Sequence, residues 1–551
     1  MIDGRRTRLA LVAVSCGLAA SALYWPTLAA QFVWDDHVLI ERNPDLERWG
    51  GLSRGFTDVA GALKGASYYR PILMASYFID RQFWGLDPTG FHLTNVVLHG
   101  LVTGLVCVLA YAYFDNLAAA AIGALLFALH PIQAQSVSLI LGRNDLLLAL
   151  PVVAMLLLAR RRRPVGALLL LYAAALWTKE TGIVAPLLLF AADAMLGGKK
   201  RDGGLRWGIP ALGFVAVTAL YLVVRFEALG SLASPSHGGL SPWNERLPQS
   251  IAFVGYYVGH ILLPRNLSPA PYAPRLANGW MLLASAGFCV LLAGAIAWAL
   301  RKRSPAGYGL VFFLAGIVPV SGFVPIQVPV LEHRLYLPMV GVALAAAAAV
   351  SRFDEKWSLA VTLPVLAVLA FATSARLPAF HDDLALWSTA IERVPDSAYV
   401  HHGYALALAR IGRDPEAVEV LRAAIRLDPG FNRARYELAL ALGRTGQREQ
   451  AIATIQDLLH RDPKDVDGWN ALAFLWKQSG DLPKCKDALE QGLRIDPRNA
   501  VLLENLGDVL TGEGDTVRAR STFEDLVRLH PQNASYRQKL DRLRGRESRP
   551  N

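Results

Sequence analysis

Cysteine is scarce in this chain of 551 residues, which contains only four. Cys16, Cys107 and Cys289 lie in apolar stretches. Cys485 lies in a helical repeat, and no spacing among the four predicts a metal site or a disulfide framework. The chain also lacks a glycine-rich phosphate-binding loop, a Ser-His-Asp nucleophile motif and a soluble nucleotide-binding domain. These absences argue against a nucleotide-sugar enzyme.

Charge is sparse as well, because 18% of the residues are charged and 53% are hydrophobic. This composition is too apolar for a soluble protein, and the length exceeds that of one compact domain. Residues 1–376 contain repeated apolar blocks, whereas charge density rises from about His381 onward. We therefore predict an all-α protein with a polytopic membrane domain at 1–376 and a water-exposed helical domain at 381–545.

The apolar blocks predict eleven membrane-spanning helices, although several are short for a hydrocarbon core of roughly 30 Å. The expected spans are residues 9–30, 92–114, 117–131, 143–159, 165–178, 181–196, 207–224, 280–300, 308–324, 335–350 and 357–374. Arg5, Arg6 and Arg8 precede the first span, which we interpret as a retained signal-anchor helix with its N-terminus in the cytoplasm.

Basic residues cluster at 160–163, 199–201 and 301–303, between apolar blocks. Lys and Arg concentrate in cytoplasmic loops, so the net charge of +10 is explained by topology rather than by nucleic-acid binding. All three clusters face the cytoplasm only if residues 251–264 do not cross the membrane. A twelfth span there is the alternative. Eleven spans place the C-terminal domain in the periplasm of a bacterial inner membrane, or in the lumen of the endoplasmic reticulum.

Proline recurs every 34 residues in the C-terminal part, at Pro395, Pro429, Pro463, Pro497 and Pro531. Small and large apolar residues repeat with the same period, which is typical of the tetratricopeptide repeat and its α-solenoid. We predict four full repeats at 398–533, flanked by further helices. One of these, at about 382–394, should direct Trp387 inward. Such solenoids bind proteins or peptides, although stabilisation or oligomerisation alone is an alternative role.

Asp35 and Asp36 follow the first span directly. Carboxylates are costly to keep near hydrocarbon, so such a pair is either a solvated loop start or a functional site beside a lipid-borne substrate. Asp36 is the weakly favoured catalytic base. A divalent metal held by Asp35 and Asp36 is left open, and no other cofactor is expected.

His92, Asn95 and His99 share one face of the second predicted span. A polar stripe on an apolar span should face protein or a water-filled cavity. Binding of substrate and hydrogen bonding between helices are both consistent with this stripe.

The predicted topology places several ionisable side chains on the same side of the membrane as Asp35 and Asp36. Arg143, Lys179 and Arg334 are three separate basic sites there, and such cations suit an anionic ligand such as phosphate. Arg143 could instead pair with Asp145. The full set of predicted substrate-binding residues is Arg70, His92, Asn95, His130, Arg143, Lys179, Glu180, His333 and Arg334.

These residues stand in short motifs whose order is distinctive. The motifs are Phe32-x-Trp34-Asp35-Asp36 with Ile40 and Asn43, Arg70-Pro71, Trp84-Gly85-Leu86, His92-Leu93-Thr94-Asn95, His130-Pro131, Lys179-Glu180-Thr181 and Arg334-Leu335-Tyr336-Leu337-Pro338. Together they resemble the membrane glycosyltransferases of the C superfamily. With the trailing repeats, the chain is most similar to the transmembrane-and-tetratricopeptide O-mannosyltransferases and their bacterial relatives.

The resemblance implies transfer of a sugar, often mannose, from a polyprenyl-phosphate donor to protein hydroxyl groups on the non-cytoplasmic face. It also implies that an acidic residue of the first external loop is catalytic, which corresponds to Asp35 or Asp36. The expected partners are the lipid-linked sugar, membrane lipid and an acceptor protein bound by the repeats, with no nucleic acid. The alternative function is a non-enzymatic, membrane-anchored scaffold, although one helix would anchor a scaffold adequately.

Overall fold

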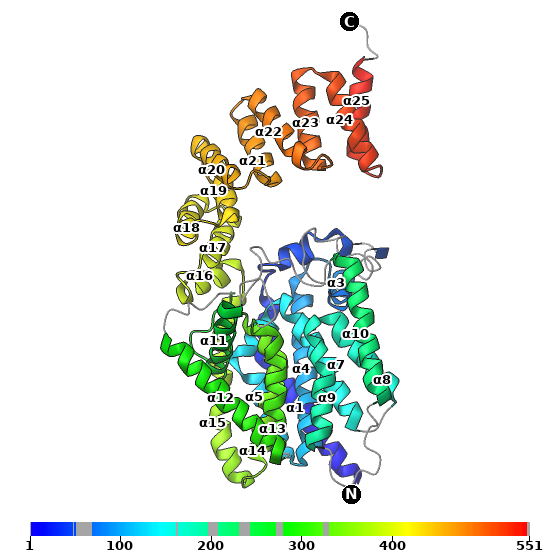
Figure 1. Ribbon diagram of the computed structural model, residues 1–551, viewed down its shortest axis with the longest axis vertical. Helices are drawn as coiled ribbons and strands as arrows, with labels where there is room; N and C mark the ends of the chain where they lie inside the picture. The colour runs from blue at the N-terminus through cyan, green and yellow to red at the C-terminus, as the bar shows by residue number, and fades with distance from the viewer. Residues whose placement is uncertain are drawn as a thin grey trace. The chain divides into compact units, whose positions relative to one another are not determined.

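The computed structural model describes residues 2–47, 49–50, 69–160, 164–196, 208–230, 243–270, 279–302, 304–322 and 330–547 (Figure 1). Within these ranges the chain is helical and contains no β-strand, which confirms the all-α fold. Two compact units separate at Val394, one of Met1–Val394 and one of Pro395–Asn551. Each unit is described by itself.

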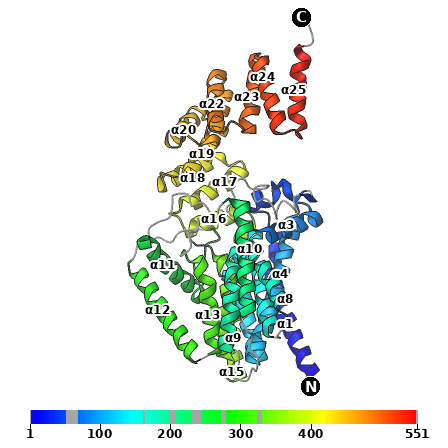
Figure 2. The same cartoon turned by 45° about the vertical axis from the view of Figure 1, so that its right-hand side comes forward.

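The first unit is a helix bundle, seen from a second side in Figure 2. Its helices are α1 (Ile2–Tyr24), α3 (Pro71–Trp84), α4 (Pro88–Phe114), α5 (Leu117–Leu129), α6 (Ala134–Ser138), α7 (Arg143–Arg160), α8 (Val165–Thr178), α9 (Ala185–Leu196), α10 (Gly208–Leu229), α11 (Trp243–Leu262), α12 (Gly279–Lys302), α13 (Pro305–Ile317), α14 (Tyr336–Val350), α15 (Glu355–Arg376) and α16 (Asp383–Arg393). Within this unit, the N-terminus lies at one end of the bundle and α3 at the other (Figure 1).

Among the described residues, seven helices are long and apolar enough to cross a membrane, or eight if the bent pair 117–129 and 131–138 forms one span. The chain is therefore a multi-pass membrane protein. Each of the eleven predicted spans coincides with a helix, but α8, α9 and α13 are only 12–14 residues long. The α11 helix, which contains most of residues 251–264, is not among the candidate spans. The number eleven stays a prediction, and the basic clusters lie partly or wholly outside the described residues.

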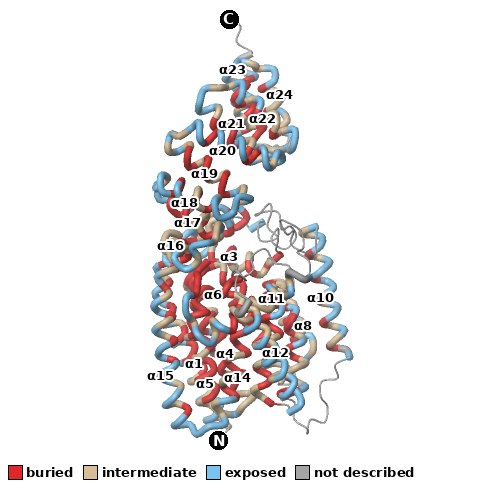
Figure 3. The backbone as a smooth tube through the Cα atoms, turned by 60° about the vertical axis from the view of Figure 1, so that its left-hand side comes forward, coloured by how far each residue is buried: buried red, intermediate tan, exposed pale blue. Residues whose placement is uncertain are grey.

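The outer helices carry large apolar side chains on their exposed faces. Leu212 of α10, Leu291 of α12 and Phe371 of α15 are all strongly exposed, and Figure 3 shows long exposed stretches on these helices. Exposed apolar rows of this kind are expected where a helix borders lipid rather than water.

Helices α1 and α4 approach each other closely through small residues. A Cβ atom added to Gly17 would lie 2.7 Å from the carbonyl oxygen of Gly100, and Ser21 donates a hydrogen bond to the carbonyl of Val96 at 3.3 Å. Glycine at a crossing lets two backbones touch. This contact fixes α1 against α4, and the chain leaves α1 directly into the segment that contains Asp35 and Asp36.

The segment that contains Asp35 and Asp36 is held by an apolar core cluster. Its buried members come from residues 32–46, from α3, from the start of α4 and from Ile140, namely Phe32, Leu39, Ile40, Leu46, Leu73, Tyr77, Phe78, Phe91 and Ile140. The rings of Phe32 and Phe91 meet edge to face at 5.4 Å between centroids. Burying one such side chain contributes about 1.5–3 kcal/mol, so the cluster anchors the loop.

The second unit consists of paired helices with a polar final helix. They are α17 (Ala398–Arg410), α18 (Asp414–Leu427), α19 (Asn432–Arg444), α20 (Arg448–Arg461), α21 (Val466–Gln478), α22 (Leu482–Ile495), α23 (Ala500–Glu513), α24 (Thr516–Leu529) and α25 (Ala534–Glu547). The predicted small packing residues, such as Ala405 and Ala417, are buried. Glycines with φ of 77–81° follow α17, α19, α21 and α23, where the chain turns into the second helix of each pair. Glycine adopts this left-handed conformation without strain, which explains its 34-residue period.

Candidate functional site

Asp36 is buried in the turn after the first span, where it is only 1% exposed. Trp34 adopts a left-handed conformation with φ of 55°, and the chain then enters the short helical turn η2 (His37–Glu41). One carboxylate oxygen of Asp36, Oδ2, accepts a hydrogen bond from the backbone N–H of Val33 at 3.1 Å. The other oxygen, Oδ1, is buried and has no hydrogen-bond partner among the described residues. Asp36 therefore both closes the turn and retains an acceptor atom for a ligand.

The electrostatic surroundings of this pair suit proton transfer near neutral pH. Burial raises the pKa of Asp36 to about 7; the Val33 N–H and His37 act in the opposite direction, while the charges of Asp35 and Asp383 raise it further. Burial also raises the pKa of Asp35, to about 6. A carboxylate whose pKa lies near the working pH can accept a proton from a hydroxyl group.

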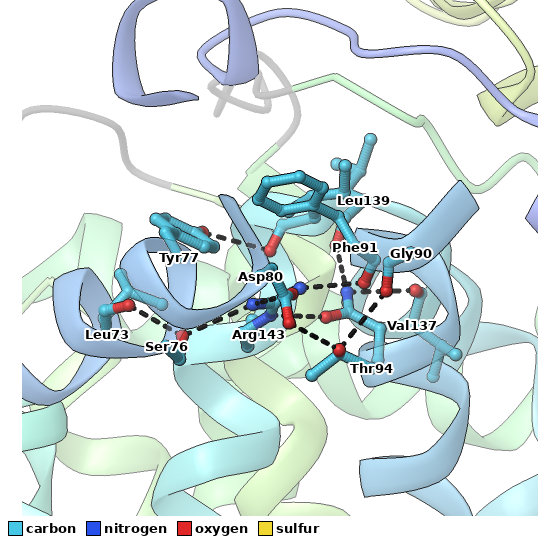
Figure 4. A network of polar contacts seen from close by, with 12 residues as sticks. Leu73, Ser76, Tyr77, Asp80, Gly90, Phe91, Thr94, Val137, Leu139 and Arg143 are labelled. Atoms are coloured by element: carbon cyan, nitrogen blue, oxygen red, sulfur yellow. Dashed lines mark hydrogen bonds and ion pairs between the residues drawn. The ribbon is translucent and has the colours of Figure 1, made fainter. Parts of the chain in front are cut away.

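Arg143 occupies the centre of a buried network at the start of α7 (Figure 4). Its side chain is fully buried and forms an ion pair with Asp80 at 2.6 Å. It also donates to Asn95 Oδ1 at 2.9 Å, to the carbonyl of Phe91 at 2.7 Å and to Ser76 Oγ at 3.4 Å. The guanidinium is thus engaged with protein groups on α3 and α4. Its partner is Asp80 rather than Asp145, and this geometry favours a positioning role over phosphate binding.

The polar stripe on α4 mainly connects helices. Asn95 donates to the carbonyls of Val137 and Leu139 at 3.2 and 2.9 Å. His99 contacts the hydroxyl of Tyr336 at 2.8 Å. His92 donates from Nε2 to the carbonyl of Gln31 at 3.4 Å, and its buried Nδ1 atom finds no partner among the residues that the structure describes. Hydrogen bonding between helices therefore accounts for Asn95 and His99, whereas His92 retains a ring nitrogen beside the Asp36 segment.

We expect the replacement of Arg143 by Met to destabilise the membrane unit. It would leave the carboxylate of Asp80, which is 5% exposed, buried without its cation, and breaking such a pair costs about 3–5 kcal/mol. Thermal unfolding in detergent measures this loss. The matched control is Arg81→Met, because its partner Glu47, at 3.7 Å, has a side chain that is 56% exposed and stays solvated when the cation is removed, so the loss should be smaller. Equal stability of the two variants would contradict the structural role of Arg143.

Lys179 lies at the end of α8 and binds the start of α7. Its ammonium group contacts Asp145 Oδ1 at 2.6 Å and Asn144 Oδ1 at 3.2 Å, and the side chain is nearly fully buried. Burial lowers the pKa of Lys179, whereas the adjacent Asp145 carboxylate counteracts this. The second oxygen of Asp145 has no hydrogen-bond partner. Arg143 thus holds Asp80, while the next two residues, Asn144 and Asp145, hold Lys179.

Arg70 and Glu180 form a bidentate ion pair beside Lys179. The guanidinium donates to both carboxylate oxygens, at 2.9 and 3.1 Å. Burial acts to raise the pKa of Glu180, but the charge and hydrogen bonds of Arg70, with a further contribution from Arg225, bring it down to about 2. Glu180 therefore stays ionised at neutral pH. Arg225 is itself buried on α10, next to the hydroxyl of Tyr221 at 3.5 Å.

Arg334 and His333 complete this group from the short helix η8 (Glu332–Leu335). Arg334 interacts with the hydroxyl of Tyr257. Burial lowers the pKa of His333, and the charges of Lys179, Arg334 and Arg70 lower it further. The His333 side chain is buried, and its Nδ1 atom has no hydrogen-bond partner within the described part of the chain. We call Arg70, Lys179, Arg225 and Arg334 the cationic cluster. Among the described residues, the carboxylates of Asp145 and Glu180 contact this cluster, through Lys179 and Arg70 respectively.

His130 and Glu332 have partners within the fold. His130 accepts from the N–H of Ile132 at 3.2 Å and donates to the carbonyl of Ile261 at 2.9 Å, which joins the α5 corner to α11. Glu332 pairs with Arg376 at 2.9 Å, and Arg376 also donates to the carbonyl of Pro131 at 2.6 Å. Both ring nitrogens of His130 are therefore engaged, which favours a positioning role.

Sequence reasoning missed Asp80, Arg225 and Asp383 as members of the site. Arg225 near the end of an apolar helix was a usable signal, because an ionisable residue there rarely faces lipid. Asp80 follows the apolar residues Phe78 and Ile79 in α3, which is a comparable signal, whereas Asp383 lies in a polar stretch that gives none. Among the residues that the structure describes, no group of three or more His, Cys, Asp or Glu side chains could hold a metal ion.

Comparison with protein families confirms the repeats. The family model described as tetratricopeptide repeat matches residues 412–474, and a second model of the same description matches residues 384–430. Among solved structures, the protein MamA 41-end from Desulfovibrio magneticus RS-1 is 19% identical, and the match covers 27% of this chain and 85% of that protein with a TM-score of 0.26.

Curated relatives confirm the resemblance found in the motifs. Protein O-mannosyl-transferase TMTC1 of Homo sapiens is 25% identical over 75% of this chain and 56% of its own length. Protein O-mannosyl-transferase TMTC4 of Homo sapiens is 23% identical over 73% of this chain and 64% of its own length. Protein O-mannosyl-transferase tmtc2 of Xenopus laevis is 42% identical over 22% of this chain and 15% of its own length. The chain thus spans less than two thirds of the length of these relatives.

Proposed function

Because the chain is similar to TMTC protein O-mannosyl-transferases over about 75% of its length, we propose that it is a membrane glycosyltransferase. In this proposal it transfers a sugar, mannose by the likeness, from a polyprenyl-phosphate donor to a hydroxyl group of a protein. The observation that carries the proposal is Asp36, a buried carboxylate with one unpartnered oxygen and a pKa of about 7. The gathering of four cations in the cationic cluster supports it.

The donor's phosphate binds at the cationic cluster, where Arg334 supplies a planar set of donors and Lys179, while paired with Asp145, supplies a point charge. The N-terminus of α7 links the two halves of the site, because Arg143 organises α3 and α4 while Asn144 and Asp145 hold Lys179. The phosphate is thereby held at the same end of the bundle as Asp36.

Asp36 accepts the proton of the acceptor hydroxyl through its free oxygen. The hydroxyl oxygen then forms a bond to the anomeric carbon of the sugar, and the bond from that carbon to the phosphate oxygen breaks. Polyprenyl phosphate leaves with the electron pair, and the cationic cluster stabilises the charge that develops on it. No step requires a metal ion.

We place this chemistry on the non-cytoplasmic face, because Arg5, Arg6 and Arg8 lie at the opposite end of α1 from Asp36. The repeats would then bind the acceptor protein outside the cytoplasm. A scaffold without activity is the competing function, and it gives no reason for gathering the cationic cluster at one end of a membrane bundle, with Lys179 and Arg225 buried.

The proposal is tested with the purified full chain in lipid nanodiscs. Radiolabelled polyprenyl-phosphate mannose and a set of Ser- and Thr-containing acceptor peptides are supplied, and transfer is followed by mass spectrometry. We expect label on peptide hydroxyl groups. No transfer to any peptide, with lipid-linked mannose or with lipid-linked glucose, would favour the scaffold.

The rate of transfer should rise with pH through about 7, because Asp36 acts as a base only after it has lost its proton. Below that pKa the rate should fall about tenfold per pH unit. The negative charge of Asp35 raises the pKa of Asp36, so Asp35→Asn should move the acidic limb to lower pH. Initial rates at saturating donor measure both effects. If the acidic limb of the pH–rate profile moved to higher pH in Asp35→Asn, the assignment of Asp36 as the base would be contradicted.

A further inference from the structure

The turn that carries Asp35 and Asp36 is bound by a carboxylate from a distant helix. Asp383, the first residue of α16, accepts a hydrogen bond from the backbone N–H of Trp34 at 2.8 Å through Oδ1. Its other oxygen, Oδ2, accepts from His37 Nε2 at 2.8 Å. The two contacts flank the aspartate pair, one on each side. A single side chain therefore bridges the residue before the pair and the residue after it.

Further contacts hold α16 against this turn. The N–H of Gln31 donates to the carbonyl of His381 at 2.8 Å, and the rings of Trp34 and Trp387 meet edge to face with centroids 5.8 Å apart. His37 also contacts Glu41 through Nδ1, so its imidazole lies between two carboxylates. The side chains of His37 and Asp383 are 13% and 14% exposed, where charge-assisted hydrogen bonds are stronger than in water.

The turn needs these contacts because its backbone conformation is unfavourable by itself. Trp34 has a left-handed φ of 55°, which a residue with a bulky side chain rarely adopts and which persists only where surrounding contacts hold it. The Val33 N–H, on one side of Trp34, is held by Asp36, and the Trp34 N–H is held by Asp383. Loss of Asp383 would release the turn and with it the direction of the Asp36 side chain.

We propose that Asp383 is a positioning residue. Through it, α16, the helix that leads into the repeats, sets the geometry of the turn that contains Asp36. The match to the tetratricopeptide family model begins at residue 384, whereas α16 packs within the Met1–Val394 unit. The helix that leads into the repeats is thus part of the membrane unit's site. The catalytic consequence rests on the proposed glycosyltransferase function, whereas the structural consequence does not.

Two variants of the full chain separate this role from simple folding. Asp383→Ala removes both contacts. Asp383→Asn keeps an acceptor for the Trp34 N–H and removes the charge that faces His37. The matched control is Asp382→Ala, because Asp382 caps α16 by accepting from the N–H of Ala385 at 2.8 Å and has no contact with Trp34 or His37 among those described.

Hydrogen exchange of the peptide that contains residues 32–40 is the first measurement, in the absence of any substrate. We expect exchange at the Trp34 amide to rise about tenfold in Asp383→Ala, less in Asp383→Asn, and least in Asp382→Ala, which removes only the N-cap of α16. Unchanged protection in Asp383→Ala would overturn the proposal whether or not the chain is an enzyme.

Transfer kinetics are the second measurement. Asp383→Ala should lower kcat about tenfold without changing KM for the donor, and the double variant with Asp36→Asn should be no slower than Asp36→Asn alone. Independent, multiplicative losses would overturn the claim that Asp383 acts through Asp36. If the unaltered chain transfers no sugar, the proposed function fails, and the exchange experiment still decides the role of Asp383.

Discussion

Replacing Asp36 by Asn is expected to remove nearly all sugar transfer. The side chains have the same shape, but an amide cannot accept the hydroxyl proton, and general base catalysis contributes about 10²–10⁴-fold. The amide oxygen of Asn can still accept from the Val33 N–H, so the turn should persist. The loss should therefore appear in kcat, with KM for the lipid donor and thermal stability close to those of the unaltered chain.

Asp35→Asn is the matched control for this experiment. Asp35 is adjacent in sequence and partly exposed, and its backbone carbonyl rather than its carboxylate accepts from the N–H groups of Val38 and Leu39. We expect a partial loss of transfer, smaller than that of Asp36→Asn. Full activity of both variants would reject the catalytic interpretation of this pair. A larger loss in Asp35→Asn would instead reverse the assignment of the base.

The second large effect is expected for donor binding at the cationic cluster. Arg334→Gln should weaken the affinity for polyprenyl-phosphate sugar about ten- to a hundredfold, because a hydrogen bond to a charged group contributes roughly 1.5–3 kcal/mol. Lys179→Gln should do the same and should also lower stability, because it leaves Asp145 buried without its cation. Equilibrium binding of a fluorescent donor analogue in nanodiscs measures these affinities.

Two further variants make the donor experiment specific. Arg301→Gln changes an exposed cation at the C-terminal end of α12 and should leave donor affinity unchanged. Arg143→Met should lower stability, since Arg143 is engaged with Asp80 and Asn95. If Arg334→Gln and Lys179→Gln both bound donor like the unaltered chain, the phosphate would have to bind elsewhere.

The periodic features of the chain could be predicted from residues alone. Proline every 34 residues and the small packing residues predicted the repeats, and the helices α17–α24 follow that period. Apolar runs predicted a helix at each expected span. These features depend on neighbours within one or two turns or within one repeat, so their signal is local.

The grouping of ionisable residues at one end of the bundle was also predictable in part. The predicted topology assigned Asp36, Lys179 and Arg334 to one side, and the structure places Lys179 and Arg334 around the same histidine, His333. Alternation of spans supplies this information, because it determines which helix ends meet on a common face. It does not determine which side chains touch.

The choice of partners was decided by tertiary structure alone. Sequence proximity suggested Asp145 for Arg143, yet the guanidinium lies across α3 and pairs with Asp80, while Asp145 pairs with Lys179. Likewise, His37 meets Asp383 across 346 residues of chain. A buried charge needs the nearest available counter-charge, and which one is nearest depends on how the helices pack. The sequence alone therefore determined the repeats, the apolar helices and their ends, whereas helix packing decided which charges hold the Asp36 turn and which face a ligand.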